Sequence, residues 1–239
     1  MGKIHPPQHR PLHRVRRQIS LHQKTRHTAD LVVLGFYFCL RSCKYLKCTG
    51  YRRIVQFRPL MDLVFFVRDI LLPQDAPIGW FECVTQISLT LDNHKNAIRG
   101  ETISHFRSEC PSACPVRSAI NIFLCQREHG CDPTTTFSDY PTPQGLCSIR
   151  ASIVITLLRA ECKRVGAARL RFAPEDVGTH SLRSGGATTM HIVDVPDRTL
   201  MAIGRWRLLG FMVYIQQQIS SFSTGVSVHM SAQPWFRHL

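Results

Sequence analysis

Apolar and polar positions alternate with different periods along the chain, and the longest patterns are helical. From about Thr28 to Lys47 the pattern is helical, and the nearly continuous apolar run LVVLGFYFCL within it predicts a largely buried helix. Helical periodicity recurs at 116–128 and 148–165. Gly166 follows the last of these, and glycine is the residue type typical just beyond a helix C-terminus.

Shorter segments have the alternation of β-strands. The stretches RRIVQF and LVFFV predict strands, and residues 84–106 form the clearest hairpin pattern. In that hairpin Ile87, Leu89 and Leu91 alternate with polar residues, and a polar turn then leads into a returning strand. The proline- and threonine-rich segment Pro133–Gly145 predicts a loop.

The pattern as a whole predicts a mainly α fold with a small antiparallel β-sheet (α+β). The segment 178–220 adds two or three more short helices, and there are no internal repeats. Residues 1–27 predict a basic, disordered N-terminal arm because they lack apolar periodicity. We therefore expect one folded domain at 28–220, followed by a C-terminal tail at 221–239.

The charge of the chain changes this picture more than its composition does. Thirty Lys and Arg against sixteen Asp and Glu give a formal net charge of +14 over 239 residues. Such an excess favours a polyanionic partner, either nucleic acid or an anionic membrane surface. The basic arm has two interpretations: a segment that lies on phosphates, with a weak nuclear address around 14–17, or a solvated leader.

Three further sequence features narrow the class of protein. The longest apolar run has ten residues, which is too short to span a bilayer, and no secretion signal follows the N-terminus. The ten cysteines are therefore expected to be reduced thiols. They include no C-x2-C pair, although His129 lies close to Cys125 and Cys131, so a metal site is a minor alternative.

The stretch THSLRSGGATTM has the chemistry of a phosphate site. Thr179 is the expected N-cap of a helix whose first turn carries His180 and Arg183 on one face. Gly185 and Gly186 lie in the same helix, where each glycine costs about 1 kcal/mol relative to alanine. We therefore expect another group to approach this backbone closely. Basic groups at a helix N-terminus form a favourable site for an anion.

These residues also carry a family resemblance. HSLRSGGAT, then GRW, then YIQ resembles the C-terminal half of the phage-integrase type of tyrosine recombinase, closest to those of eukaryotic mobile elements. The resemblance covers about residues 28–220, which would be the recombinase catalytic domain, and its specific part is 179–216. It implies six catalytic residues in family order: Arg41, Lys95 on a hairpin turn, His180, Arg183, Trp206 and the nucleophile Tyr214.

The resemblance implies DNA strand cleavage and rejoining through a 3′-phosphotyrosyl intermediate. Two arginines would stabilise the charge on the non-bridging oxygens, and Lys95 would protonate the departing 5′ oxygen. The expected partner is double-stranded DNA, bound by a homo-oligomer, with no cofactor, no metal, no small-molecule substrate and no membrane. The expected location is nuclear in a eukaryote and otherwise cytoplasmic.

Three departures from the family pattern favour an alternative, a catalytically dead DNA-binding remnant of a mobile-element recombinase. Lys44 stands where the family usually has an acid that orients the early arginine. Residues 208–210 replace a serine-containing segment before the tyrosine. The N-terminal clamp domain of the family is missing, so we expect a truncated element. Two weaker alternatives are a type IB topoisomerase, which shares this chemistry, and a zinc-dependent interaction module.

Each of the six residues also has an ordinary structural role open to it. Arg41 is expected to cap a helix or pair with an acid, and Lys95 to be solvated, if neither is catalytic. Trp206 and Tyr214 then fill core positions. Catalysis instead requires all six side chains to converge on one cleft. We expect Arg41 and Arg183 to be neighbours, on the premise that only an anion holds two guanidiniums together.

Overall fold

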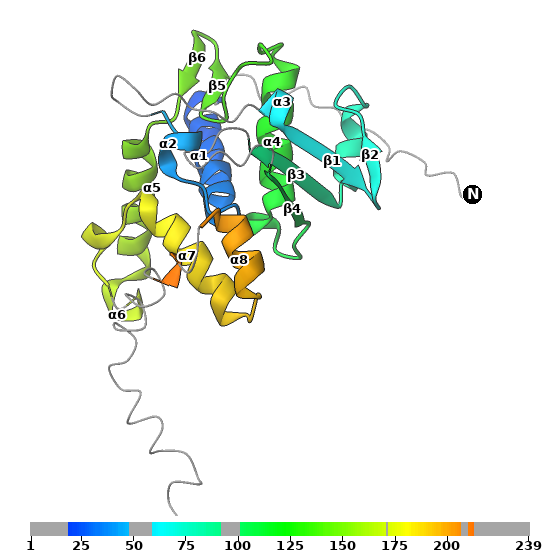
Figure 1. The fold of residues 1–239 in the computed structure, drawn as a ribbon. Coiled ribbons are helices and arrows are strands. Elements are labelled where there is room, and N and C mark those ends of the chain that lie inside the picture. The colour runs from blue at the N-terminus through cyan, green and yellow to red at the C-terminus, as the bar shows by residue number, and fades with distance from the viewer. Residues whose placement is uncertain (1–18, 48–58, 92–100, 171, 207–209, 213–239) are drawn as a thin grey trace, which may run out of the picture.

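The computed structural model describes residues 19–47, 59–91, 101–170, 172–206 and 210–212, which adopt a mixed α+β fold that is mostly helical (Figure 1). The predicted strand RRIVQF, Lys95 and Tyr214 lie outside the described residues. The helices are α1 Ile19–Tyr37, α2 Ser42–Tyr45, α3 Pro59–Asp62, α4 Pro115–Glu128, α5 Ala151–Val165, α6 Ala167–Leu170, α7 Thr179–Ile192 and α8 Asp197–Gly204. The strands are β1 Leu63–Val67, β2 Ile70–Leu72, β3 Gln86–Leu91, β4 Glu101–Phe106, β5 Asp139–Thr142 and β6 Gly145–Ser148. Short 3₁₀ helices occupy Ile78–Cys83, Pro111–Ala113 and Pro174–Asp176.

Four strands form one antiparallel sheet in the order β2-β1-β3-β4. The predicted hairpin is confirmed, because β3 pairs with β4 from Gln86↔Phe106 to Leu91↔Glu101. The predicted strand LVFFV is also confirmed as β1, which pairs Leu63 with Leu89. Leu63 and Phe65 of β1 and Ile87 and Leu89 of β3 are buried on the core face, and Ser88 between them is buried as well, within 2.7 Å of the Ser104 hydroxyl.

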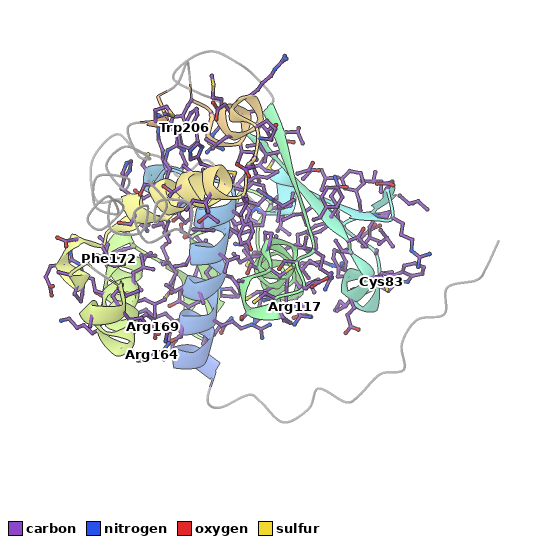
Figure 2. The ribbon with its side chains drawn as sticks, turned by 90° about the horizontal axis from the view of Figure 1, so that it is seen from below. Cys83, Arg117, Arg164, Arg169, Phe172 and Trp206 are labelled. Atoms are coloured by element: carbon purple, nitrogen blue, oxygen red, sulfur yellow. The ribbon has the colours of Figure 1, made fainter. Side chains whose placement is uncertain are left out.

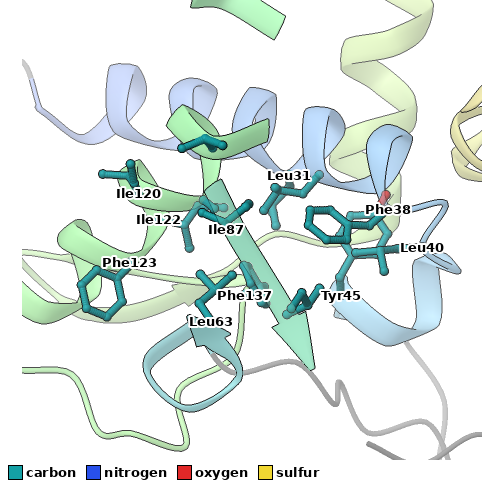
Figure 3. Packing of buried hydrophobic residues seen from close by; sticks show 14 of the residues in the cluster. Leu31, Phe38, Leu40, Tyr45, Leu63, Ile87, Ile120, Ile122, Phe123 and Phe137 are labelled. Carbon is teal, nitrogen blue, oxygen red and sulfur yellow. The ribbon is translucent and has the colours of Figure 1, made fainter. Parts of the chain in front are cut away.

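Helix α1 runs through the middle of the molecule, between α4 and α5 (Figure 1). Its apolar side chains join strand and α4 residues in the main core, where Leu31 and Phe38 lie close to Ile87 (Figure 3). The aromatic rings of Phe65, Phe81 and Phe123 pack together in the same core, with ring centroids 4.8–5.3 Å apart. Helices α4 and α5 thus flank α1, whose C-terminal end lies at the candidate site.

The boundaries predicted for this helix are wrong at both ends. It begins at Ile19, so residues 19–27 belong to α1 rather than to a disordered arm. His27, which is 4% exposed, anchors that part of the helix by donating to the Phe137 carbonyl oxygen at 2.8 Å. The helix ends at Tyr37 instead of continuing to Lys47, because Cys39 has a φ of 46° that interrupts helical geometry.

The loop predicted at Pro133–Gly145 is partly wrong as well. A second hairpin, β5–β6, pairs Asp139 with Ser148 and Pro141 with Leu146. The side-chain amide of Gln126 on α4 donates to the carbonyl oxygens of Thr136 and Asp139, both at 2.8 Å, and so fixes the approach to β5. Tertiary hydrogen bonds therefore order a segment whose composition is typical of a loop.

Two helices, α7 and α8, are described within the segment predicted to contain two or three. The N-cap of α7 is Gly178 rather than Thr179, and the Gly178 N–H donates to the Ser181 hydroxyl at 3.1 Å. The predicted helix end at Gly166 is confirmed, with a φ of 92° that favours glycine. None of the helices in the described residues combines the length and apolar character needed to cross a bilayer.

Candidate functional site

The C-terminal end of α1 lies among basic side chains from three parts of the chain. Arg41 and Lys44 belong to the start of α2, His180 and Arg183 to α7, and Arg205 follows α8. We call these five residues the basic cluster. Figure 2 shows Trp206, which follows Arg205, on the opposite side of the molecule from Arg164 and Arg169.

Arg183 is the most buried member of the basic cluster, at 1% exposed. Its Nη1 donates to the Cys39 carbonyl oxygen, and its Nη2 donates to the Gly204 carbonyl oxygen at 2.5 Å. The guanidinium also lies over the Trp206 ring, with Cζ 4.4 Å from the ring centroid. The guanidinium therefore joins the end of α1 to the end of α8 from its position on α7.

Arg205 also donates hydrogen bonds to the C-terminal end of α1. Its Nη2 donates to the carbonyl oxygens of Phe38 at 3.2 Å and Cys39 at 3.0 Å. Arg205 has a φ of 53°, a left-handed conformation that closes the C-terminus of α8. Two guanidiniums, Arg183 and Arg205, thus share the Cys39 carbonyl.

The carbonyl groups at the end of α1 explain why these cations lie together without an anion between them. The last carbonyls of a helix have no partners within the helix, and the helix dipole places partial negative charge there. Our premise that only an anion would hold two guanidiniums together is therefore wrong for Arg183 and Arg205. Their grouping has a structural cause, and proximity of arginines is not by itself a sign of catalysis here.

Arg41 lies close enough to His180 for its charge to affect the pKa of the histidine. Desolvation lowers the pKa of His180, and the positive charges of Arg183 and Arg41 lower it further. Burial likewise lowers the pKa of Lys44, and Arg41 and Arg205 add to this effect against the opposing influence of a neighbouring thiol. Both His180 and Arg41 are exposed, so they form the accessible surface above the buried pair.

Glycines allow α7 to cross the end of α1 at close range. A Cβ at Gly186 would collide with the Phe36 carbonyl oxygen and would lie 3.0 Å from Cys39 Sγ. At Gly185 a Cβ would lie 3.4 Å from the Phe36 ring. The expected close approach to this backbone is therefore present, and the approaching group is α1 rather than a ligand.

Trp206 contacts the basic cluster and is also part of a small hydrophobic core. It packs with the buried residues Ala187, Leu200 and Phe211, and its ring lies 6.0 Å from that of Phe211. The ring folds back over Gly204, where any Cβ would overlap it. Trp206 thus fills the core position expected of an indole and also contacts the Arg183 guanidinium.

The structure thus brings together four of the six predicted catalytic residues: Arg41, His180, Arg183 and Trp206. Lys95 and Tyr214 lie outside the described residues, so their catalytic roles stay predictions. Arg205 is a member of the basic cluster that sequence reasoning missed, although the GRW triplet already contained it.

Other parts of the described chain hold cavities. One of about 390 Å³ lies between α1 and α5 and includes Lys24 and Thr156. Another of about 670 Å³ lies beside β2 and includes Leu71 and Trp80. The described residues contain no group of three or more His, Cys, Asp or Glu side chains placed to hold a metal ion.

Comparison with known proteins adds no relative. No family model matches the sequence, and neither a curated protein nor a solved structure matches it. The resemblance to tyrosine recombinases therefore depends on the motif residues themselves.

Proposed function

We propose that this chain acts on DNA as the catalytic domain of a tyrosine recombinase. The observation that carries the proposal is the grouping of Arg41 with His180 and Arg183, which come from segments far apart in the sequence. Both arginines are close enough to His180 to lower its pKa. Helices α1, α2 and α7 bring these groups together beside Trp206. The net charge of +14 supports a polyanionic substrate.

In the proposed reaction the Tyr214 phenolate oxygen attacks a DNA phosphorus atom, and the bond to the 5′ oxygen breaks. Lys95 gives its proton to that oxygen, leaving a 5′ hydroxyl and a 3′-phosphotyrosyl bond. Arg41 and His180, the exposed members of the basic cluster, donate to the non-bridging oxygens. In the second step a 5′ hydroxyl attacks the phosphotyrosine, and the phenol leaves, so that the strand is rejoined.

Arg183 supports this function as a fixed positive charge behind the phosphate. Its side chain is only 1% exposed and donates to two backbone carbonyls, so in this structure burial keeps it from clamping an external anion. Its guanidinium still lowers the pKa of His180 and adds to the local positive potential.

A second candidate is a DNA-binding remnant without turnover. The burial of Arg183 favours it, because bidentate clamping of a phosphate would require the guanidinium to become exposed. Lys44, at the position of the family's orienting acid, adds a cation where Arg41 would otherwise have an anionic partner. A remnant of this kind would retain phosphate binding through the exposed Arg41 and His180.

Covalent trapping separates the two candidates. A duplex nicked close to the cleavage position loses a short fragment after attack, so the phosphotyrosyl adduct accumulates and survives denaturing electrophoresis. The recombinase proposal predicts this adduct for the natural chain and none for Tyr214→Phe. Tyr140→Phe is the matched control, because Tyr140 lies on β5 beside His27, away from α7 and α8 (Figure 1), and its loss should leave the adduct intact.

DNA affinity across a range of salt concentrations tests the binding that both candidates share. Arg41→Ala should weaken binding about fivefold and reduce the salt slope by about 1, because one phosphate contact is lost. Arg169→Ala removes an exposed cation on α6, away from Trp206 (Figure 2), and should change affinity less than twofold. Binding without an adduct supports the remnant, and equal losses in the two variants contradict both candidates.

A further inference from the structure

Two cysteines flank a single turn between β4 and α4. Cys110 precedes the 3₁₀ helix Pro111–Ala113 and is exposed, whereas Cys114 follows it and is 1% exposed. The Ala113 N–H donates to the Cys110 carbonyl oxygen at 3.2 Å, which closes the turn. A turn of this kind brings its first and fourth residues, Cys110 and Ala113, within about 7 Å, and Cys114 is the next residue along the chain. A disulfide between them requires the exposed Cys110 to move toward Cys114 until their Cα atoms lie within about 6.8 Å.

Ser108 forms hydrogen bonds with both cysteines. The Ser108 N–H donates to Cys114 Sγ at 3.4 Å, and the Ser108 hydroxyl donates to the Cys110 carbonyl oxygen at 3.1 Å. The phenol of Tyr37 lies against the same group. Burial raises the pKa of Tyr37, and negative charge on Cys114 and Cys110 raises it further. Both thiols thus act on one phenol, and the four side chains form a single cluster.

The surroundings of both thiols favour the thiolate. A hydrogen bond with the Ser112 hydroxyl, 3.4 Å from Cys110 Sγ, and one with the Ala113 backbone lower the pKa of Cys110. Burial by itself would raise the pKa of Cys114, but N–H groups including those of Arg117 and Ser108 lower it below its ordinary value. The thiolate is the reactive form of cysteine, so this pair combines an accessible nucleophile with a buried partner.

A second pair of thiols in the same chain has the opposite character. Cys125 and Cys131 also interact electrostatically, but burial raises the pKa of each. They are each partly buried, and neither is exposed as Cys110 is. Sequence proximity of cysteines therefore does not distinguish the two pairs, whereas exposure and hydrogen bonding do.

We propose that Cys110 and Cys114 form a dithiol site that hydroperoxides oxidise to an intramolecular disulfide. The Cys110 thiolate attacks one peroxide oxygen, the O–O bond breaks, and the departing oxygen takes a proton to leave as an alcohol or water. Cys114 then attacks the sulfur of the resulting sulfenic acid and expels water. The balance is two thiols and one hydroperoxide giving one disulfide, one alcohol or water, and one water. The proposal does not depend on the DNA chemistry.

A single tryptic peptide reports on this site. Cleavage after Arg107 and Arg117 releases Ser108–Arg117, which contains Cys110 and Cys114 and no other cysteine. The full chain is treated with hydrogen peroxide, alkylated under denaturing conditions and digested. We expect this peptide to lose two hydrogens and both alkylation sites about tenfold faster than Cys125 loses its alkylation.

Two variants separate the roles of the thiols. Cys114→Ser places serine, a residue type favoured at helix N-caps, at the N-cap of α4. This variant should accumulate a Cys110 sulfenic acid, which a 1,3-diketone such as dimedone traps. Cys110→Ser should leave Cys114 unoxidised, because Cys114 is buried. Formation of a Cys110 sulfinic acid without a disulfide in the natural chain would overturn the proposal. So would disulfide-linked dimers, or oxidation of Cys125 at an equal rate.

Discussion

The two ends of helix α1 bury polar side chains by different means. Toward its N-terminus, burial lowers the pKa of His27 to about 4, so that histidine is neutral at pH 7. Burial raises the pKa of Asp30 to about 6, although a hydrogen bond from Asn121 at 3.1 Å opposes this. At the C-terminus, Arg183 and Arg205 keep their charge and donate to backbone carbonyl oxygens.

The difference follows from the chemistry of the side chains. Histidine and aspartic acid lower the cost of burial by changing protonation, whereas arginine stays protonated in proteins. A buried arginine therefore needs acceptors at fixed positions, and the end of a helix provides them. We infer that the stability of the N-terminal half of α1 depends on pH. The stability of its C-terminal end depends instead on the positions of the carbonyl acceptors.

Removing the guanidinium of Arg183 is the strongest test of the second half of this comparison. Arg183→Ala leaves a cavity, removes the side-chain donor to the Gly204 carbonyl oxygen and removes one of the two donors to the Cys39 carbonyl oxygen, so the free energy of unfolding should fall by about 3–5 kcal/mol. Urea denaturation measures this. Arg169→Ala, a change at an exposed arginine, should stay within about 0.5 kcal/mol. A loss below about 1 kcal/mol for Arg183→Ala would contradict the joining role of the guanidinium.

Acidification tests the first half of the comparison. The folded pKa of His27 lies below the ordinary value of 6.5, so the unfolded chain binds more protons between pH 6.5 and about 4. The contribution of His27 to stability should be full above pH 6.5 and should fall by about 2–3 kcal/mol as the pH drops to 4. His105, whose pKa burial also lowers to about 4, contributes with the same sign, and Asp30 contributes with the opposite sign over the same pH range. Urea titrations at each pH should show a shallower decline for His27→Gln, and an unchanged slope would argue against this role.

The crossing of α7 over α1 offers a matched pair of substitutions. Gly186→Ala places a methyl group against the Phe36 carbonyl oxygen, and we expect it to cost about 2 kcal/mol. Gly185→Ala meets only the Phe36 ring at 3.4 Å, so the gain in helix propensity should leave stability equal or slightly higher. Thermal unfolding of the two variants measures the contrast. Equal effects would show that the crossing is looser than described.

Asp30→Asn gives the smallest expected effect, and its sign depends on pH. The folded pKa of Asp30 is raised to about 6, so its contribution to stability is full below pH 3.8 and lost as the pH rises through 6. Asparagine retains an oxygen acceptor for Asn121 and has no charge to bury. We expect about 1 kcal/mol of stabilisation at pH 7 and none at pH 4, measured by urea denaturation. Stabilisation that is equal at both pH values would contradict this explanation.

The elements that sequence predicted are those whose own residues specify them. Alternation of Ile87, Leu89 and Leu91 predicts β3 whatever surrounds it, and glycine alone explains the end of α5 at Gly166. The β5–β6 hairpin was missed because its order depends on a residue of α4. The side-chain amide of Gln126 donates to backbone oxygens at the start of the hairpin. Composition typical of loops does not reveal such tertiary bonds.

The start and the end of α1 were missed for related reasons. Polar residues such as His27 and Asp30 conceal a buried helix face, because their burial depends on changed protonation and partners on other elements. The end of the helix has no glycine or proline to mark it, and only the φ of 46° at Cys39 shows it. The spacing of His180 and Arg183 predicted one shared helical face, but not that Arg183 would bind the Cys39 carbonyl.

The bonds at the end of α1 also set an order of events during synthesis. Arg183 binds Cys39 across 144 residues, and Arg205 binds Phe38 across 167. At about 5–20 residues per second, a ribosome completes α1 roughly 7–30 s before it adds Arg183. During that interval the carbonyl groups of Phe38 and Cys39 lack both arginines. The basic cluster therefore assembles after translation of α8, and contacts of such long range slow that last folding step.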